Sequence, residues 1–236
     1  MKRIAQNKSR VAFPELDQSL NEVGALPRLH LRSELHIVRK IWHLTMGSLI
    51  AFIYLLSGMS STAGMTIIGS LLAISLIVET ARLRIPALNR RVLKIWAPFM
   101  RAHECSGPSA VPPYLLSTLI AIAIFPKPVA VLSILYLAYG DPIASLFGIL
   151  YGDRSIRLPG GKSLIGTAAG TITCILVSFA FLKMLSFPDS SILAISVLGG
   201  LAGGTAELMP IDVDDNLSIP VISGFVLWLT FILFGF

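Results

Sequence analysis

Seven long apolar runs are the feature that most constrains what this chain can fold into. They cover residues 41–57, 61–79, 112–126, 129–150, 164–186, 190–208 and 219–236. Several approach the ~20 residues that an α-helix needs to cross the hydrocarbon core of a bilayer. Helices alone suit them, because open sheets leave backbone groups unsatisfied in lipid and barrel strands are short and alternating. The sequence predicts an all-α, polytopic membrane helix bundle of seven transmembrane helices.

Basic residues indicate how this bundle is oriented. Seventeen Lys and Arg residues lie before the first span or in 80–111 and 151–163, whereas the opposite side has only Lys127 and Lys183. Basic loops tend to stay in the cytoplasm, so the N-terminus is expected there and the C-terminus outside. We expect 1–33 to be a flexible basic cytoplasmic tail and 34–236 an integral membrane catalytic domain. The net charge of +6 then reflects loops, and we expect no nucleic-acid partner.

Residues 80–111 contain a different kind of helix, with apolar residues at helical spacing opposite three basic ones. These residues are Leu88, Val92, Ile95, Trp96 and Phe99, facing Arg90, Arg91 and Lys94. The pattern predicts an amphipathic helix on the inner leaflet. A solvated connector is the alternative, which the Trp and Phe disfavour.

Carboxylates within or just after the apolar runs are the main functional signal. They are Asp141, Glu207, Asp212, Asp214 and Asp215. An ionisable group inside a membrane costs roughly 2.5–3.5 kcal/mol on insertion scales, so it usually marks a wet functional cavity.

Asp141 lies near the middle of the fourth span, between Gly140 and Pro142. Pro142 lacks a backbone donor and clashes with the preceding turn, which predicts a broken helix lining a cavity. Ser145, Gly148 and Gly152 continue a small polar face from Asp141. The alternative is a proline kink whose aspartate bonds to a neighbouring helix.

Asp153 begins a short basic loop, where Arg154 or Arg157 could pair with it. A solvated loop acid and a direct role are equally compatible with this position. A supporting role beside the next motif is the most that we assign.

The stretch Gly160-Gly161-Lys162-Ser163 opens the fifth span. It resembles the end of a P-loop, but Ile156 stands where that motif needs glycine. A Gly-rich turn, a lysine and a helix N-terminus together favour a phosphate. A plain cytoplasmic turn with a snorkelling lysine is the alternative.

The last polar cluster begins with Glu207, at the end of the sixth span, and continues with Asp212, Asp214, Asp215 and Asn216. These are oxygen ligands with no His or Cys nearby, so they favour a hard cation such as Mg²⁺. An ordinary acidic loop is the alternative.

The first helix contributes Glu34, Arg39, Lys40 and His43. Glu34 is too far along the chain for one i,i+4 pair with Lys40 or His43, so we expect partners on other elements. A solvated helix face is the alternative.

Five stretches in this order resemble the membrane CTP-dependent lipid-alcohol kinases, which include dolichol kinase, phytol kinase and the fungal-type diacylglycerol kinase. The stretches are ELHIVRKIWHL (34–44), RAHECSGPSAVPPYLL (101–116), YGDPIASLFGILYGDRS (139–155), GGKSLIGTAAG (160–170) and AELMPIDVDDNLSIP (206–220). The resemblance covers residues 34 to 236. The family is distantly related to the phosphatidate cytidylyltransferases.

The resemblance implies transfer of the γ-phosphate of CTP, with a divalent cation such as Mg²⁺, to a lipid hydroxyl. Asp141 matches a Gly-Asp signature, Lys162 and Ser163 a Lys-Ser signature with Gly166 after it, and Asp215-Asn216 an Asp-Asn pair after the acid Glu207. Pro142 and the extra Asp212 and Asp214 depart from the pattern, which leaves open which acids hold the metal.

The resulting hypothesis assigns four kinds of role. The catalytic residues are Asp141, Lys162, Glu207 and Asp215. Nucleotide and phosphate contacts are Gly140, Gly160, Gly161, Lys162, Ser163 and Gly166. Metal ligands are Asp141, Glu207, Asp214, Asp215 and Asn216. Supporting residues are Arg39, Lys40, His43, Arg101, Glu104 and Asp153.

Two other functions share parts of this pattern. A cytidylyltransferase would use the same metal to make a CDP-lipid from CTP and a lipid phosphate. A small-solute transporter would also have broken helices and intramembrane acids, but no inverted repeat is evident. The residues leave open the lipid alcohol (diacylglycerol, phytol or a polyprenol such as dolichol) and the oligomeric state, and CTP rather than ATP follows only from the resemblance.

Overall fold

The structure is a computed structural model that describes residues 37–158, 161–208 and 213–236. The predicted tail 1–33 lies outside the described residues, as do Glu34, Gly160 and Asp212.

The described residues are mostly helical and form no strand beyond one isolated bridge between Arg157 and Ser163. The α-helices are α2 (Ile37–Leu56), α3 (Ser61–Arg84), α4 (Pro86–Trp96), α5 (Val111–Ile124), α6 (Lys127–Leu135), α7 (Asp141–Tyr151), α8 (Leu164–Met184), α9 (Asp189–Thr205) and α10 (Asp215–Leu233). The all-α prediction is confirmed.

Five helical segments in the described ranges are long and apolar enough to cross a membrane. They are Ser61–Arg84, Lys127–Arg154, Leu164–Met184, Asp189–Leu208 and Asp215–Leu233. The other two predicted spans correspond to α2 and α5, and α5 has only 14 residues, about 21 Å of helix. The protein is an integral membrane helix bundle, and the number of seven spans stays a prediction.

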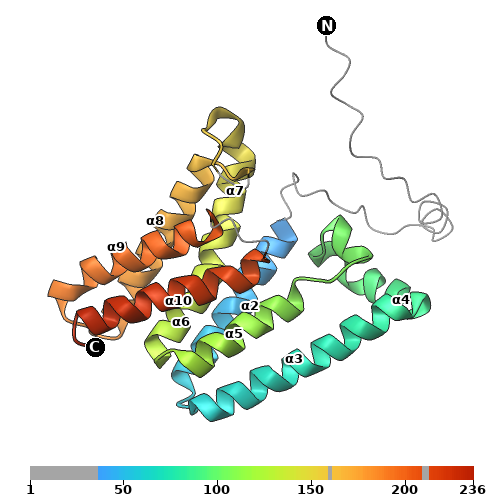
Figure 1. Ribbon diagram of the computed structural model, residues 1–236, viewed down its shortest axis with the longest axis horizontal. Coiled ribbons are helices and arrows are strands. Elements are labelled where there is room, and N and C mark those ends of the chain that lie inside the picture. The colour runs from blue at the N-terminus through green and yellow to red at the C-terminus, as the bar shows by residue number, and fades with distance from the viewer. Residues whose placement is uncertain (1–36, 159–160, 209–212) are drawn as a thin grey trace, which may run out of the picture.

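The fourth predicted span is the central helix of the bundle. Residues 129–138 are all buried, and α2, α5, α8, α9 and α10 pack around this helix (Figure 1). A helix that is apolar on every side is stable only when neighbours surround it, which explains its central position.

The predicted break at Pro142 is wrong. Helix continues from Lys127 to Arg154, and the irregularity is a π turn over Tyr136–Gly140, directly before α7. A π turn pairs residue i with i+5, so the turn before Pro142 is wider than the α turn in which the proline ring would clash with a carbonyl. The chain adapts to Pro142 by widening the helix rather than interrupting it.

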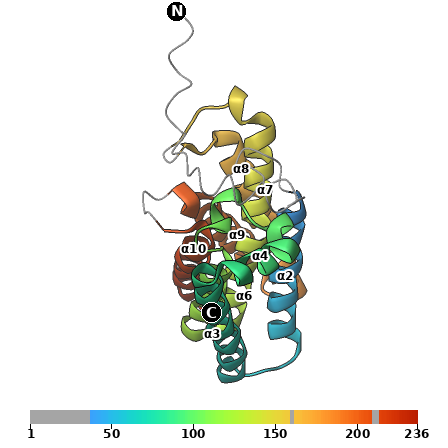
Figure 2. The same ribbon diagram turned by 90° about the vertical axis from the view of Figure 1, so that its right-hand side faces the viewer.

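The central helix is also long for a membrane. Its 28 residues correspond to about 42 Å, against roughly 30 Å of hydrocarbon. In both views the end of α7 and the start of α8 project beyond the other helices (Figures 1 and 2). Asp141 is therefore at the middle of its own helix but close to the ends of its neighbours.

Glycines bring α7, α8 and α9 into close contact. A β-carbon on Gly166 would lie 2.7 Å from the Ala144 carbonyl oxygen, and one on Gly204 would lie 1.9 Å from Thr171 Oγ1. Small residues of this kind let membrane helices approach backbone to backbone. These contacts fix α8 between α7 and α9.

The amphipathic helix predicted within 80–111 is α4, but its apolar stripe divides differently. Leu93 is buried against the protein, whereas Ile95 and Trp96 remain exposed. Arg82 lies within the predicted 80–111 connection between spans, but it belongs to the last turn of α3 and is 2% exposed. Its guanidinium binds groups inside the protein, including the carbonyls of Glu104 and Gly107.

Candidate active site

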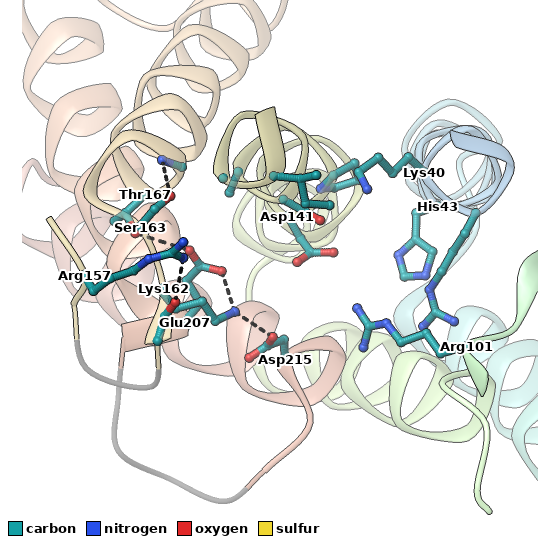
Figure 3. Close-up of a pocket in the computed structure, with 18 of the residues that line it drawn as sticks. Lys40, His43, Arg101, Asp141, Arg157, Lys162, Ser163, Thr167, Glu207 and Asp215 are labelled. Carbon is teal, nitrogen blue, oxygen red and sulfur yellow. Dashed lines mark hydrogen bonds and ion pairs between the residues drawn. The ribbon is translucent and has the colours of Figure 1, made fainter. Parts of the chain in front are cut away.

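A cavity of about 490 Å³ contains most of the predicted site residues. One wall comes from α7, Arg157, residues 161–167, the turn at Ala206–Leu208 and the start of α10. The opposite wall comes from the start of α2 and from Arg101. Figure 3 shows Asp141 between the two walls.

Three carboxylates that are distant in sequence meet in this cavity. Asp141, Glu207 and Asp215 each offer an oxygen, and these oxygens lie within 4.8 Å of one another. Asp141 begins α7, Glu207 follows α9 and Asp215 begins α10. No histidine or cysteine joins this group within the described residues, and a set of carboxylate oxygens fits a hard cation such as Mg²⁺.

Lys162 binds two of these acids directly. Its Nζ donates to Glu207 Oε2 and to Asp215 Oδ2, at 2.9 Å each. Burial acts to lower the pKa of Lys162, but the two carboxylates outweigh it and raise the pKa. Lys162 thus neutralises part of the negative charge of Glu207 and Asp215.

The described residues on either side of the turn predicted to hold phosphate are hydrogen-bonded to one another. Leu158 N donates to the Lys162 carbonyl at 2.7 Å, and Gly161 N donates back to the Leu158 carbonyl at 3.1 Å. Gly161 has a φ of +76°, a conformation that glycine adopts without strain. Its amide is therefore used inside the turn.

The first amides of α8 are also occupied. Leu164 N binds the Ile156 carbonyl, Ile165 N binds Ser155 Oγ, and Gly166 N binds the cap hydroxyl of Ser163. Open N-terminal amides are what makes a helix start an anion site. With these amides occupied, the side chain of Lys162 is the group of this segment that lines the cavity beside the carboxylates.

Two glycines assigned to nucleotide contact have different surroundings. Gly140 is buried, and a β-carbon there would lie 2.6 Å from Cys174 Sγ. It does not line the cavity, whereas Gly166 does. Gly140 therefore serves the packing of the π turn against α8.

Asp214 is not a member of the cluster formed by Asp141, Glu207 and Asp215, and it contacts Asn216, whose role as a metal ligand stays a prediction. Asp214 is the N-cap of α10, and its Oδ1 accepts from both the backbone and side-chain nitrogens of Asn216. Capping of this kind satisfies otherwise unpaired amides. Of the predicted metal ligands, the structure brings together Asp141, Glu207 and Asp215.

The opposite wall is basic and comprises Arg39, Lys40, His43 and Arg101, which we call the basic wall. Arg39 Nη1 donates to Glu104 Oε1 and Oε2, at 2.8 and 3.0 Å, and to the Phe99 carbonyl at 3.1 Å. This pair is the interaction between elements that the sequence predicts for the first helix. Its side chains are 8% and 4% exposed, so the 97–105 segment is anchored to α2 from inside.

Asp153 lies at the rim. It pairs with Arg157 at 2.9 Å, and its side chain is 96% exposed. The predicted loop pair is confirmed, and such an exposed pair contributes little to stability.

Thr167 is a site residue that the sequence reasoning missed. Its Oγ1 donates to Glu207 Oε1 at 3.4 Å, and it lines the cavity with Ser145 and Arg157. Ser163, Gly166, Thr167 and Gly170 follow helical 3-1-3 spacing. That stripe of small and polar residues could have indicated which face of α8 meets the site.

Comparisons with known proteins identify relatives for part of the chain. It is 29% identical over 160 residues to CTP-dependent diacylglycerol kinase 1 of Schizosaccharomyces pombe, covering 64% of this chain and 73% of the relative. It is 32% identical over 166 residues to the protein of that name from Eremothecium gossypii, covering 63% and 52%. A probable chloroplastic phytol kinase of Triticum aestivum is 30% identical over 132 residues, covering 52% and 43%.

The chain is homologous to CTP-dependent lipid kinases. This agrees with the family that the five stretches predict, and neither the cytidylyltransferase nor the transporter is favoured by these relatives. The matched part spans about half of the second relative and less than half of the third. No protein-family model matches the chain, and no solved structure matches it.

Proposed function

We propose that this chain transfers the terminal phosphoryl group of CTP to the hydroxyl group of a membrane lipid. The observation that carries the proposal is one cavity with a carboxylate cluster on one wall and a basic wall on the other. Phosphoryl transfer needs positioning and charge neutralisation more than covalent participation of the protein. The relatives named as CTP-dependent kinases support the choice of nucleotide.

In this proposal Asp141, Glu207 and Asp215 hold the divalent cation. When bound, the cation neutralises developing negative charge on the phosphate oxygens. Asp214 and Asn216 keep the start of α10 in place through their capping contacts, and so position Asp215 without binding the metal.

Lys162 and the basic wall bind the phosphates from two sides. Lys162 approaches from the acidic side, where it is held by Glu207 and Asp215. Within the described residues Arg39 donates its hydrogen bonds through Nη1, which leaves Nε and Nη2 for a ligand. A guanidinium suits phosphate because its donors form a planar fork.

The lipid hydroxyl is placed at the bilayer surface rather than at the midplane. The cluster lies where α9 has ended and α10 begins, so the reacting groups are at the helix ends. The 13 residues that follow Asp141 in Asp141–Arg154 extend about 20 Å further. In the proposed orientation this end of the bundle faces the cytoplasm. We further assign to Asp141 the acceptance of the proton from the lipid hydroxyl.

Purified protein with γ-labelled CTP and a panel of lipid alcohols tests this function. We expect label in a lipid phosphate and release of CDP. Release of pyrophosphate would instead identify a cytidylyltransferase, and nucleotide-independent solute flux in proteoliposomes would identify a transporter.

Variants test the residues. Asp141→Asn and Lys162→Ala should each abolish transfer, while Asp153→Asn, a matched acid at the rim with 96% exposure, should retain it. Near-normal transfer by Asp141→Asn or by Lys162→Ala would refute its assigned role.

A further inference from the structure

Helix α4 combines exposed cations with exposed apolar side chains. Arg90, Arg91 and Lys94 are exposed, and Ile95 and Trp96 on the same short helix are 69% and 39% exposed. Within the described residues these three cations make no hydrogen bond or ion pair, unlike Arg82 one turn before the helix. Unpaired basic residues beside exposed Trp and Ile are typical of a helix at a charged membrane surface.

The start of α4 is tied to the segment that supplies Arg101. Asn89 Nδ2 donates to the Cys105 carbonyl at 2.9 Å, and Arg82 Nη1 donates to Asn89 Oδ1 at 3.1 Å. Arg82 Nη2 also donates to the carbonyls of Glu104 and Gly107, at 3.1 and 2.8 Å. A buried arginine thus links α4 to the loop that presents Arg101.

The end of α4 is tied to α2 beside Arg39. Trp96 packs edge-on against Trp42 with ring centroids 5.5 Å apart, and Phe99 lies 5.0 Å from the Trp42 ring. The carbonyl of Phe99 accepts the hydrogen bond from Arg39. Both ends of α4 therefore contact groups that hold the basic wall.

We propose that α4 is a docking surface for anionic lipid headgroups, and that docking steadies the basic wall and lowers the KM for nucleotide. The occupant is a negatively charged leaflet, because α4 offers three cations and no acidic side chain. The regulatory step rests on the proposed kinase function, whereas the docking step does not.

Docking is tested by hydrogen exchange of the α4 amides in vesicles. Vesicles of phosphatidylcholine alone are compared with vesicles that also contain phosphatidylserine or phosphatidylglycerol. We expect exchange about tenfold slower in both anionic mixtures, as charge attraction of three basic residues permits. Equal exchange in neutral and anionic vesicles overturns the docking, and slowing by one anionic lipid alone overturns recognition by charge.

Matched variants separate charge from fold. The triple variant Arg90→Gln, Arg91→Gln, Lys94→Gln should lose the lipid-dependent slowing. The charge-preserving variant Arg90→Lys, Arg91→Lys, Lys94→Arg should keep it. Equal responses of the two variants would overturn the assignment to these cations.

The coupling is measured as KM for CTP against kcat. Anionic vesicles should lower KM for the wild type and the charge-preserving variant, with kcat unchanged, and should leave KM of the neutralised variant unaffected. If anionic vesicles leave the KM of the wild type unchanged, the coupling is overturned. The docking is then still decided by the hydrogen-exchange result. Loss of all transfer in every vesicle would contradict the kinase function instead.

Discussion

The buried pair Arg39–Glu104 gives the sharpest test of how the basic wall is held. In Glu104→Gln the guanidinium keeps a neutral acceptor but loses its counter-charge in a place where the two side chains are 8% and 4% exposed. Removing one partner of a buried ion pair costs about 3–5 kcal/mol. For a chain of this size that corresponds to a fall in Tm of roughly 6–20 °C.

The assay combines thermal unfolding in detergent with nucleotide kinetics. The double variant Arg39→Met, Glu104→Leu replaces both charges by apolar groups of similar volume, and such exchanges are often neutral or stabilising. We expect the double variant to recover the Tm but not the affinity for CTP, because Arg39 is gone. A Glu104→Gln protein with unchanged Tm, or a double variant with normal KM for CTP, would refute this reasoning.

Three further outcomes follow from single contacts. Gly166→Ala should destabilise by about 1–3 kcal/mol, because its β-carbon would meet the Ala144 carbonyl at 2.7 Å; Gly69→Ala, with open space at that position, is the thermal-unfolding control and should lose nothing. Lys162→Met should lower Tm at neutral pH, since carboxylates raise the pKa of Lys162 in the folded protein. The stabilisation from a raised pKa is complete below the unfolded pKa of about 10.4 and disappears as pH rises through the folded pKa. The Tm difference from wild type should therefore shrink only at strongly alkaline pH, and a difference that shrinks below pH 9 would contradict this account. Asp153→Asn should leave Tm and KM unchanged, because its pair with Arg157 is exposed. A large fall in Tm or a large rise in KM would give Asp153 a direct role.

Apolar runs predicted where the helices lie because membrane helices must satisfy their own backbone. Local chemistry was less reliable where two solutions compete. Pro142 indicated a break, but the chain widens into a π turn over Tyr136–Gly140. Arg82 falls within the predicted 80–111 connection, but it is a buried residue of α3, where Glu79 and the carbonyls of Glu104 and Gly107 satisfy its guanidinium.

The candidate site was predictable as a set of residues and not as a geometry. The sequence singled out Asp141, Glu207 and Asp215 because acids at apolar spans are costly. It could not show that these three meet while Asp214 caps α10, since that depends on how helices far apart in sequence pack. The Gly-rich turn suggested backbone contacts to phosphate, yet the amides of Gly161, Leu164 and Gly166 bind protein acceptors instead.

The close glycine contacts among α7, α8 and α9 have a consequence for motion. Gly166 and Gly170 meet Ala144, and Gly204 meets Thr171, with no room for even one added carbon. Packed helices in such contact move as one body, because a dense interior deforms poorly. The wall of the cavity that rests on α7, α8 and α9 is therefore the more rigid one. If the proposed function holds, any adjustment to a bound nucleotide falls to the opposite wall, where the short turn at Ala102–Cys105 and the start of α2 lie outside those three helices.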